Sequence, residues 1–267
     1  MTHQIIMCDE APTSAVPGGR ACPPLPVWKR ALDVACIVLA SPVVLPAMGL
    51  IALLIKCTSR GPVFYRHERV GYRRQRFVCL KFRTMTEAAD HSPHAEHFKQ
   101  LVESDHAMIK IDVNGDKRIF PLGRFLRATG LDELPQLFNV LRGEMSLVGP
   151  RPCLPYEEVN YGPRDVARFE AMPGLTGLWQ VSGKNSTSFS EMIAFDLRYA
   201  RTKSLPRDLW IIAKTMPVLA AQTWAWCRQT SPDRRRSAGP PATAAFACVP
   251  SPTLNSQALA DCPKADR

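Results

Sequence analysis

The strongest constraint on this chain is an uncharged apolar segment from Val34 to Ile55, which is 22 residues long. As a straight helix it would be about 33 Å long, enough to cross the hydrocarbon core of a bilayer. It is interrupted by Ser41, Pro42 and Pro46, and proline removes a backbone donor and bends or breaks a helix. We therefore expect a membrane segment with a break at Ser41 and Pro42, where the serine hydroxyl helps to satisfy the freed backbone groups.

Basic residues enclose this segment on both sides. Lys29 and Arg30 precede it, and nine basic residues against one acid, Glu68, lie between positions 56 and 83. Cationic flanks are retained on the cytoplasmic side of a membrane. Two such flanks predict a re-entrant helix that dips into the inner leaflet and returns, and a single kinked transmembrane helix is the alternative.

The composition restricts the cellular compartment and the classes of binding partner that are expected. The nine cysteines form no C-x-x-C pair, which favours a reduced compartment over a disulfide scaffold. The formal net charge of +10 and pI near 9.3 suit lipid headgroups, nucleotide phosphates or nucleic acid. The position of the charge beside the apolar segment favours anionic membrane lipids.

The rest of the chain predicts an α+β fold that is mainly helical, with a small β element and interfacial amphipathic helices. We expect strands at 62–65 and 77–82 around a turn at Gly71, and two helices within 122–141 that are broken near Gly130. Asp132 and Glu133 are expected at the N-terminus of the second helix. A polar segment, 86–110, is helical or a surface insertion, and helices follow at 189–202 and 208–226. The predicted organisation is a disordered segment 1–26, a re-entrant helix 27–57, a cytoplasmic domain 58–226 and a disordered tail 227–267.

Five sequence blocks occur in a recognisable order. They are 29–33 (KRALD), 81–85 (KFRTM), 127–136 (RATGLDELPQ), 143–152 (GEMSLVGPRP) and 173–185 (PGLTGLWQVSGKN). Together they resemble the bacterial sugar transferases, which are monotopic phosphoglycosyl transferases, and most of all the undecaprenyl-phosphate galactose phosphotransferases of exopolysaccharide synthesis. The resemblance covers about residues 28–226.

The resemblance implies a reaction at the cytoplasmic face of the bacterial inner membrane. A UDP-sugar gives its sugar 1-phosphate to undecaprenyl phosphate and UMP is released. In this family the residue matching Asp132 attacks the phosphorus next to the sugar, and Glu133 holds Mg²⁺. The chemistry of both residues agrees with these roles, because a carboxylate attacks phosphorus when nearby cations withdraw charge and Mg²⁺ prefers hard oxygen ligands.

Other residues in these blocks are candidates for substrate binding. Arg127 and Arg151 carry guanidinium forks that match phosphate oxygens, and Pro150 and Pro152 restrict the backbone around Arg151. Strand alternation places Lys81 and Arg83 on one face. Gln180 and Lys184 are expected to shape the nucleotide site, although the family commonly has Arg where this chain has Lys184. A structural turn is an equal interpretation for Gln180.

Three other features carry weaker predictions. His91, His94 and His97 do not share one helical face, so a solvated segment is favoured over a zinc site. Asp116 and Arg118 resemble a family segment, but Lys117 replaces its proline and we assign them no catalysis. A membrane-anchored adaptor with a basic domain for nucleic acid or acidic partners is the alternative function. It leaves Asp132 and Glu133 without a role, and we expect no nucleic acid partner; the sequence does not predict the oligomeric state.

Overall fold

The computed structural model describes residues 26–86, 118–183 and 187–230. The described residues up to Trp226 belong to one compact unit. Several predicted features lie wholly or mostly outside the described residues. They are the terminal segments 1–26 and 227–267, the polar segment 86–110 with its histidines, Asp116, Lys117 and Lys184. Of the predicted disordered tail, residues 227–230 are described and continue the last helix, so the prediction is wrong for these four positions.

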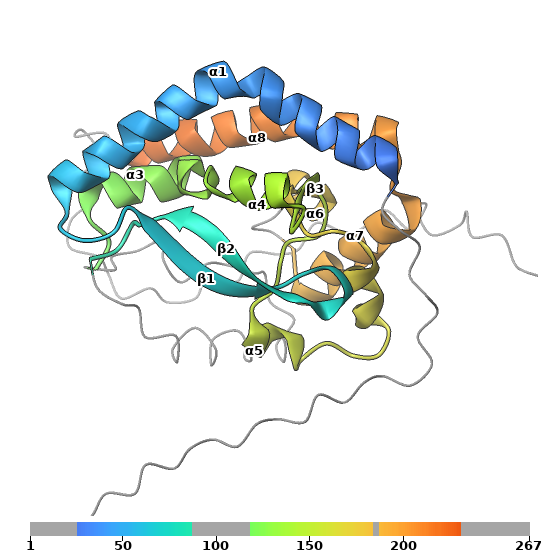
Figure 1. Ribbon diagram of the computed structural model, residues 1–267. Helices are drawn as coiled ribbons and strands as arrows, with labels where there is room; N and C mark the ends of the chain where they lie inside the picture. Colours follow the sequence, from blue (N-terminus) through green and yellow to red (C-terminus); the bar gives the residue numbers. More distant parts are fainter. Residues whose placement is uncertain (1–25, 87–117, 184–186, 231–267) are drawn as a thin grey trace, which may run out of the picture. The chain divides into compact units, whose positions relative to one another are not determined.

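The apolar segment forms one long helix, α1 (Val27–Thr58), with Pro42 and Pro46 inside it. It is the one helix among the described residues that is long and apolar enough to cross a membrane. Figure 1 shows α1 bent near its middle but unbroken. The bend stays helical because the Ser41 hydroxyl donates to the carbonyl of Val38 at 2.8 Å, which is the acceptor that Pro42 cannot reach. The predicted break is therefore a kink within a continuous helix.

One side of α1 packs against the rest of the unit along both of its halves. Ile37, in the first half, contacts a cluster with Cys79, Val140 and Met145. In the second half, a cluster joins α1 to the following strand and helix through Met48, Ile51, Ile55, Phe82, Phe120 and Leu126. The other side of α1 exposes large apolar side chains, with Leu39 81% exposed. Such an exposed apolar surface indicates contact with lipid or a partner.

A β-hairpin follows α1, as predicted. Strands β1 (Phe64–Val70) and β2 (Arg76–Phe82) pair antiparallel, and a short 3-10 turn, η1 (Tyr72–Arg74), joins them. The register pairs Tyr65 with Lys81 and Arg69 with Phe77. Alternate residues of a strand share a face, so Lys81, Cys79 and Arg69 lie on one face of the hairpin.

The predicted helical pair within 122–141 is α3 (Pro121–Thr129) and α4 (Gln136–Arg142). Gly130 ends α3 with φ 75°, a left-handed conformation that glycine adopts without strain. Asp132 and Glu133 were expected at the start of the second helix. They lie instead in a separate 3-10 turn, η3 (Leu131–Glu133), because Pro135 caps α4 and delays its start.

The remaining elements follow α4 in the chain. A parallel pair, β3 (Ser146–Val148) and β4 (Gly174–Thr176), is accompanied by short helices. These are α5 (Pro155–Glu158), the 3-10 helix η4 (Asp165–Glu170) and α6 (Leu178–Val181). Two long helices close the described chain, α7 (Phe189–Thr202) and α8 (Leu205–Thr230). The bounds of α7 agree with the prediction, and α8 extends beyond its predicted ends.

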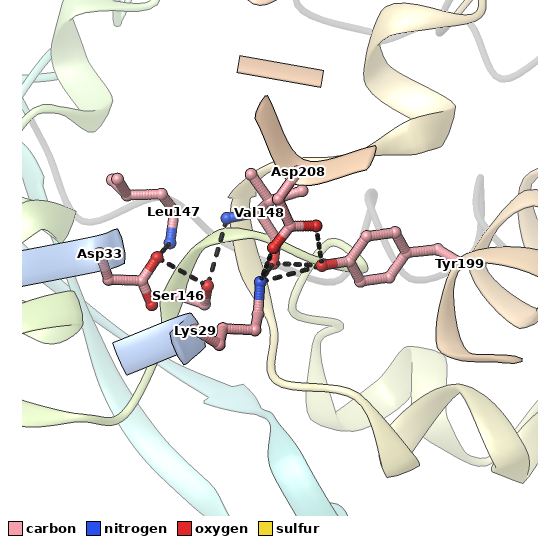
Figure 2. Close-up of polar contacts among 7 residues, drawn as sticks. All are labelled: Lys29, Asp33, Ser146, Leu147, Val148, Tyr199 and Asp208. Carbon is pink, nitrogen blue, oxygen red and sulfur yellow. Dashed lines mark hydrogen bonds and ion pairs between the residues drawn. The ribbon is translucent and has the colours of Figure 1, made fainter. Parts of the chain in front are cut away.

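A buried polar network fixes the start of α1. Figure 2 shows the Lys29 ammonium between α8, α7 and β3. Its Nζ donates to the Val148 carbonyl at 2.8 Å, the Tyr199 hydroxyl at 2.9 Å and the Asp208 carboxylate at 2.5 Å. One turn later, Asp33 Oδ1 accepts from the Ser146 hydroxyl and the Leu147 amide, both at 3.0 Å. We call Lys29, Asp33, Ser146, Tyr199 and Asp208, with these backbone groups, the anchor network.

The anchor network changes how the first basic flank is interpreted. Lys29 is 3% exposed, and Arg30 donates to the carbonyls of Val140 and Leu141 at the end of α4. Both cations therefore have partners within the protein, where the sequence predicted a charged flank of the membrane segment. The N-terminal end of α1 is held by these contacts.

Candidate active site

The predicted acidic pair lies against the hairpin. Asp132 is 8% exposed and Glu133 is partly exposed. Lys81 Nζ donates to Glu133 Oε1 at 2.7 Å, so η3 and β2 are joined by an ion pair. The structure thus brings together two blocks that are about 50 residues apart in the chain.

Asn139 holds α4, and with it η3, at a fixed position on the hairpin. It is fully buried, its Nδ2 donates to the Val78 carbonyl at 2.7 Å, and its Oδ1 accepts from the Leu80 amide at 3.0 Å. A buried amide with both ends bonded to one strand sets the register between the elements. Asn139 is not predictable from the sequence, because nothing in its local pattern separates it from a surface asparagine.

A rigid loop after β3 presents Arg151 to the same region. Four consecutive carbonyl groups of this loop accept hydrogen bonds: those of Pro150, Arg151, Pro152 and Cys153. The donors are the Gly174 amide at 2.8 Å, Arg168 Nη2 at 3.0 Å, Arg69 Nη1 at 3.2 Å and the Val70 amide at 2.9 Å. Because its backbone is fixed, the half-buried Arg151 loses little conformational freedom when it binds a ligand.

Behind this loop lies a second buried ion pair. Arg168 Nη2 also contacts the Asp196 carboxylate of α7 at 2.6 Å, and both side chains are almost fully buried. Burial raises the pKa of Asp196 to about 6, although the charge and hydrogen bond of Arg168 oppose this shift. The pair therefore links α7 to the backbone of the Arg151 loop.

The charged groups around η3 share one electrostatic environment. Burial lowers the pKa of Arg69, and the like charge of Arg151 lowers it further, while Glu157 and Glu133 oppose these effects. Burial likewise raises the pKa of the Cys79 thiol, and Lys81 and Arg69 oppose that shift. We call Lys81, Asp132, Glu133, Arg69 and Arg151 the hairpin cluster. It contains three cations and two carboxylates, which favours an anionic ligand.

The other predicted site residues have different surroundings. Arg83 donates to the Ser59 carbonyl at 2.8 Å and to the Arg60 carbonyl, so it contacts the end of α1 while Lys81 contacts η3. Gln180 Nε2 donates to the Leu175 carbonyl at 3.1 Å, which is a turn contact. Arg127 is half-buried in the last turn of α3. The roles of these residues in substrate binding stay predictions.

Arg69 is a residue of the hairpin cluster that the sequence analysis missed. It was counted only as one of the basic residues after the apolar segment. Strand alternation could have placed it on the face of Lys81, but only if the register of the hairpin were known.

The donor set suits a metal ion that also binds substrate. Within the described residues, no group of three or more His, Cys, Asp or Glu side chains could hold a metal ion. Mg²⁺, however, is often bound by one or two carboxylates and completed by substrate phosphates and water. Glu133, with one oxygen on Lys81 and a partly exposed carboxylate, fits that requirement.

An apolar groove of about 520 Å³ lies on the opposite face of the hairpin. It is lined by Phe64, Arg66, Val78, Leu80, Phe138 and Arg142. None of the predicted catalytic or substrate-binding residues lines it. Lys81, the predicted site residue of the hairpin strands, is therefore on the other face, with η3 and the Arg151 loop.

Comparisons with known proteins show the family of the chain. A family model described as bacterial sugar transferase matches residues 25–222. The exopolysaccharide production protein ExoY of Rhizobium meliloti is 43% identical over 195 residues, which are 72% of this chain and 84% of that protein.

Two further relatives have names that state a reaction. The UDP-glucose:undecaprenyl-phosphate glucose-1-phosphate transferase of Caulobacter vibrioides is 41% identical over 216 residues, covering 76% of this chain and 74% of that protein. The undecaprenyl-phosphate galactose phosphotransferase of Salmonella typhimurium is 40% identical over 204 residues, covering 74% of this chain and 41% of that protein.

Proposed function

The chain belongs to the bacterial sugar transferase family, and on this premise we propose that it transfers a sugar 1-phosphate from a UDP-sugar to undecaprenyl phosphate and releases UMP. The names of the relatives from Caulobacter vibrioides and Salmonella typhimurium support this reaction. The observation that carries the proposal is the ion pair between Lys81 and Glu133. It holds the acidic pair of η3 beside a set of cations, as phosphoryl transfer requires. In the cell this reaction is the first membrane step in the synthesis of exopolysaccharide or a related glycan.

Asp132 is the proposed nucleophile. Its carboxylate oxygen attacks the phosphorus attached to the sugar, and the bond from that phosphorus to the bridging oxygen of UMP breaks. The products of this step are UMP and an acyl phosphate that joins Asp132 to the sugar. An oxygen of undecaprenyl phosphate then attacks the same phosphorus, which forms the lipid diphosphosugar and returns the Asp132 carboxylate.

The surrounding residues of the hairpin cluster have complementary roles. Lys81 and Arg151 place positive charge near the phosphoryl oxygens, where it stabilises the charge that develops during transfer. Glu133 would hold Mg²⁺, which when bound withdraws charge from the same oxygens. The hydrogen-bonded carbonyls of the Arg151 loop fix the backbone that carries its guanidinium before substrate arrives.

The packing of α1 supports a re-entrant anchor on the cytoplasmic face of the inner membrane. Both halves of α1 contact the same unit, through Ile37 in one half and Ile55 in the other. A straight spanning helix would place those halves in opposite leaflets, and the unit would have to follow it through the bilayer. An anchor that enters one leaflet allows both contacts and keeps the site where an aqueous sugar nucleotide and a membrane lipid can meet. The basic residues after α1 would add contact with anionic lipids.

The proposed reaction can be tested by replacing the nucleophile. Purified protein in nanodiscs is given Mg²⁺, undecaprenyl phosphate and each of a panel of UDP-sugars, and UMP release is measured. We expect release from the wild type with at least one sugar, and a loss of at least about a thousandfold in Asp132→Asn. The matched control is Asp165→Asn, which changes a carboxylate that caps the Gly162 amide and should retain turnover. Unchanged UMP release in Asp132→Asn would reject Asp132 as the nucleophile.

A further inference from the structure

Arg69 is a buried guanidinium that uses few of its donors. Its side chain has five N–H groups, but Nη1 makes the one hydrogen bond found for it among the described residues, to the Pro152 carbonyl at 3.2 Å. Nε is buried and has no acceptor in the described part of the chain. The residue as a whole is 6% exposed. Buried polar groups are normally hydrogen-bonded, so this deficit requires an explanation.

Arg168 shows that this fold can satisfy a buried arginine. It is 2% exposed, and its two Nη atoms contact the Tyr161 hydroxyl, the Arg151 carbonyl and the Asp196 carboxylate. Arg69, at similar burial, donates to no carboxylate among the described residues. Arg69 therefore lacks the kind of acceptors that the fold provides for Arg168.

The neighbours of Arg69 indicate what would complete it. Arg69 lies on the same face of the hairpin as Lys81, and Arg151 is the charged group with the largest electrostatic effect on it. The buried guanidinium of Arg69 and the half-buried guanidinium of Arg151 repel each other, which is costly unless an anion neutralises them. Glu133 and Glu157 supply part of that charge, but Lys81 already occupies one oxygen of Glu133. The negative charge of a phosphate group would supply the rest.

We propose that Arg69 is a phosphate-binding residue of this site, an assignment that rests on the proposed function. Through Nη1 it holds the Arg151 loop, and through its remaining N–H donors it contacts a phosphoryl oxygen beside Arg151. A guanidinium fork suits this double contact better than an ammonium group, because its donors diverge in a fixed plane. The phosphate belongs to the diphosphate of the sugar nucleotide or to undecaprenyl phosphate, and the two sources have the same chemistry.

Equilibrium binding tests this proposal without turnover. Affinities for UDP and for undecaprenyl phosphate are measured separately on the full chain in nanodiscs, for the wild type, Arg69→Gln and Arg69→Lys. We expect Arg69→Gln to weaken binding of one of the two ligands by about 10- to 100-fold. Arg69→Lys should recover part of the loss, because it keeps the charge but not the fork. The ligand that is affected identifies the source of the phosphate.

The controls separate binding from folding and from the reaction itself. Arg201→Gln removes an exposed arginine of α7 and should leave both affinities unchanged. If Arg69→Gln does not fold, Arg69→Lys alone must weaken the affinity. A purely structural role would leave both affinities within about twofold of the wild type, and that result would overturn the proposal. Absence of UMP release by the wild type would reject the proposed function instead, whatever the Arg69 variants bind.

Discussion

Lys29 and Arg69 are both buried cations, but they are satisfied to very different degrees. Lys29 in the anchor network has three N–H donors and three acceptors, one of them the Asp208 carboxylate. Arg69 in the hairpin cluster has five donors and one hydrogen bond among the described residues. The acceptors of Lys29 all come from the protein, whereas Arg69 lacks an anionic partner. Buried charge that is fully paired indicates structure, whereas buried charge that is not indicates a ligand.

The largest effect should follow from removing one partner of the anchor network. Lys29→Met leaves the Asp208 carboxylate buried without its cation, which costs about 3–5 kcal/mol of stability. We expect the thermal midpoint in nanodiscs to fall by about 10 °C. Lys203→Met, which removes an ammonium group with one exposed carbonyl contact, should cost less than about 1 kcal/mol.

A double replacement sharpens this test. Lys29→Met with Asp208→Leu removes both charges, so most of the lost stability should return. If the double variant were as unstable as the two single losses combined, the ion pair would not be the stabilising unit.

Asp196 should make the free energy of unfolding depend on pH, with an effect of intermediate size. Its folded pKa, raised by burial to about 6 from an ordinary 3.8, means that the folded state binds a proton more tightly than the unfolded state. The contribution to stability is present below about pH 4 and is lost as the pH rises through about 6, with a slope of at most about 1.4 kcal/mol per pH unit. Unfolding by urea from pH 4 to 7 should show this dependence in the wild type and not in Asp196→Asn. If the free energies of unfolding of the wild type and Asp196→Asn differ by the same amount at every pH in this range, the raised pKa of Asp196 is contradicted.

The smallest stability change is expected in the hairpin cluster. Arg69→Met removes a buried charge that has one hydrogen bond. The free energy of unfolding should therefore change by less than about 1 kcal/mol in either direction. Thermal unfolding without ligands measures this directly against Lys29→Met. A loss as large as that of Lys29→Met would remove the distinction between the two cations.

The helices and strands were predicted from the sequence more accurately than the contacts between them. The apolar run, the hairpin, the pair of helices around Gly130 and α7 all follow from local periodicity and turn residues. The kink at Pro42 was predicted as a break. The sequence indicated that the Ser41 hydroxyl helps to satisfy the freed backbone groups, but not that its bond to the Val38 carbonyl lets the helix continue.

The candidate site was only partly predictable for the same reason. Asp132, Glu133, Lys81 and Arg151 lie in recognisable blocks, so the resemblance supplied them. Arg69 and Asn139 act through partners that are about 60 to 80 residues away in the chain, and the partners of Lys29 are 119 to 179 residues away. No local pattern encodes such contacts, which is why Lys29 was expected at the membrane surface.

The central claim is that Asp132 forms a covalent bond to the sugar phosphate. Intact-protein mass spectrometry after incubation with Mg²⁺ and the active UDP-sugar, without undecaprenyl phosphate, measures this intermediate most directly. We predict a mass increase of one sugar phosphate on the wild type, lost when undecaprenyl phosphate is added and missing from Asp132→Asn. The same adduct on Asp132→Asn, or rapid turnover by the wild type with no adduct at any time, would contradict the account.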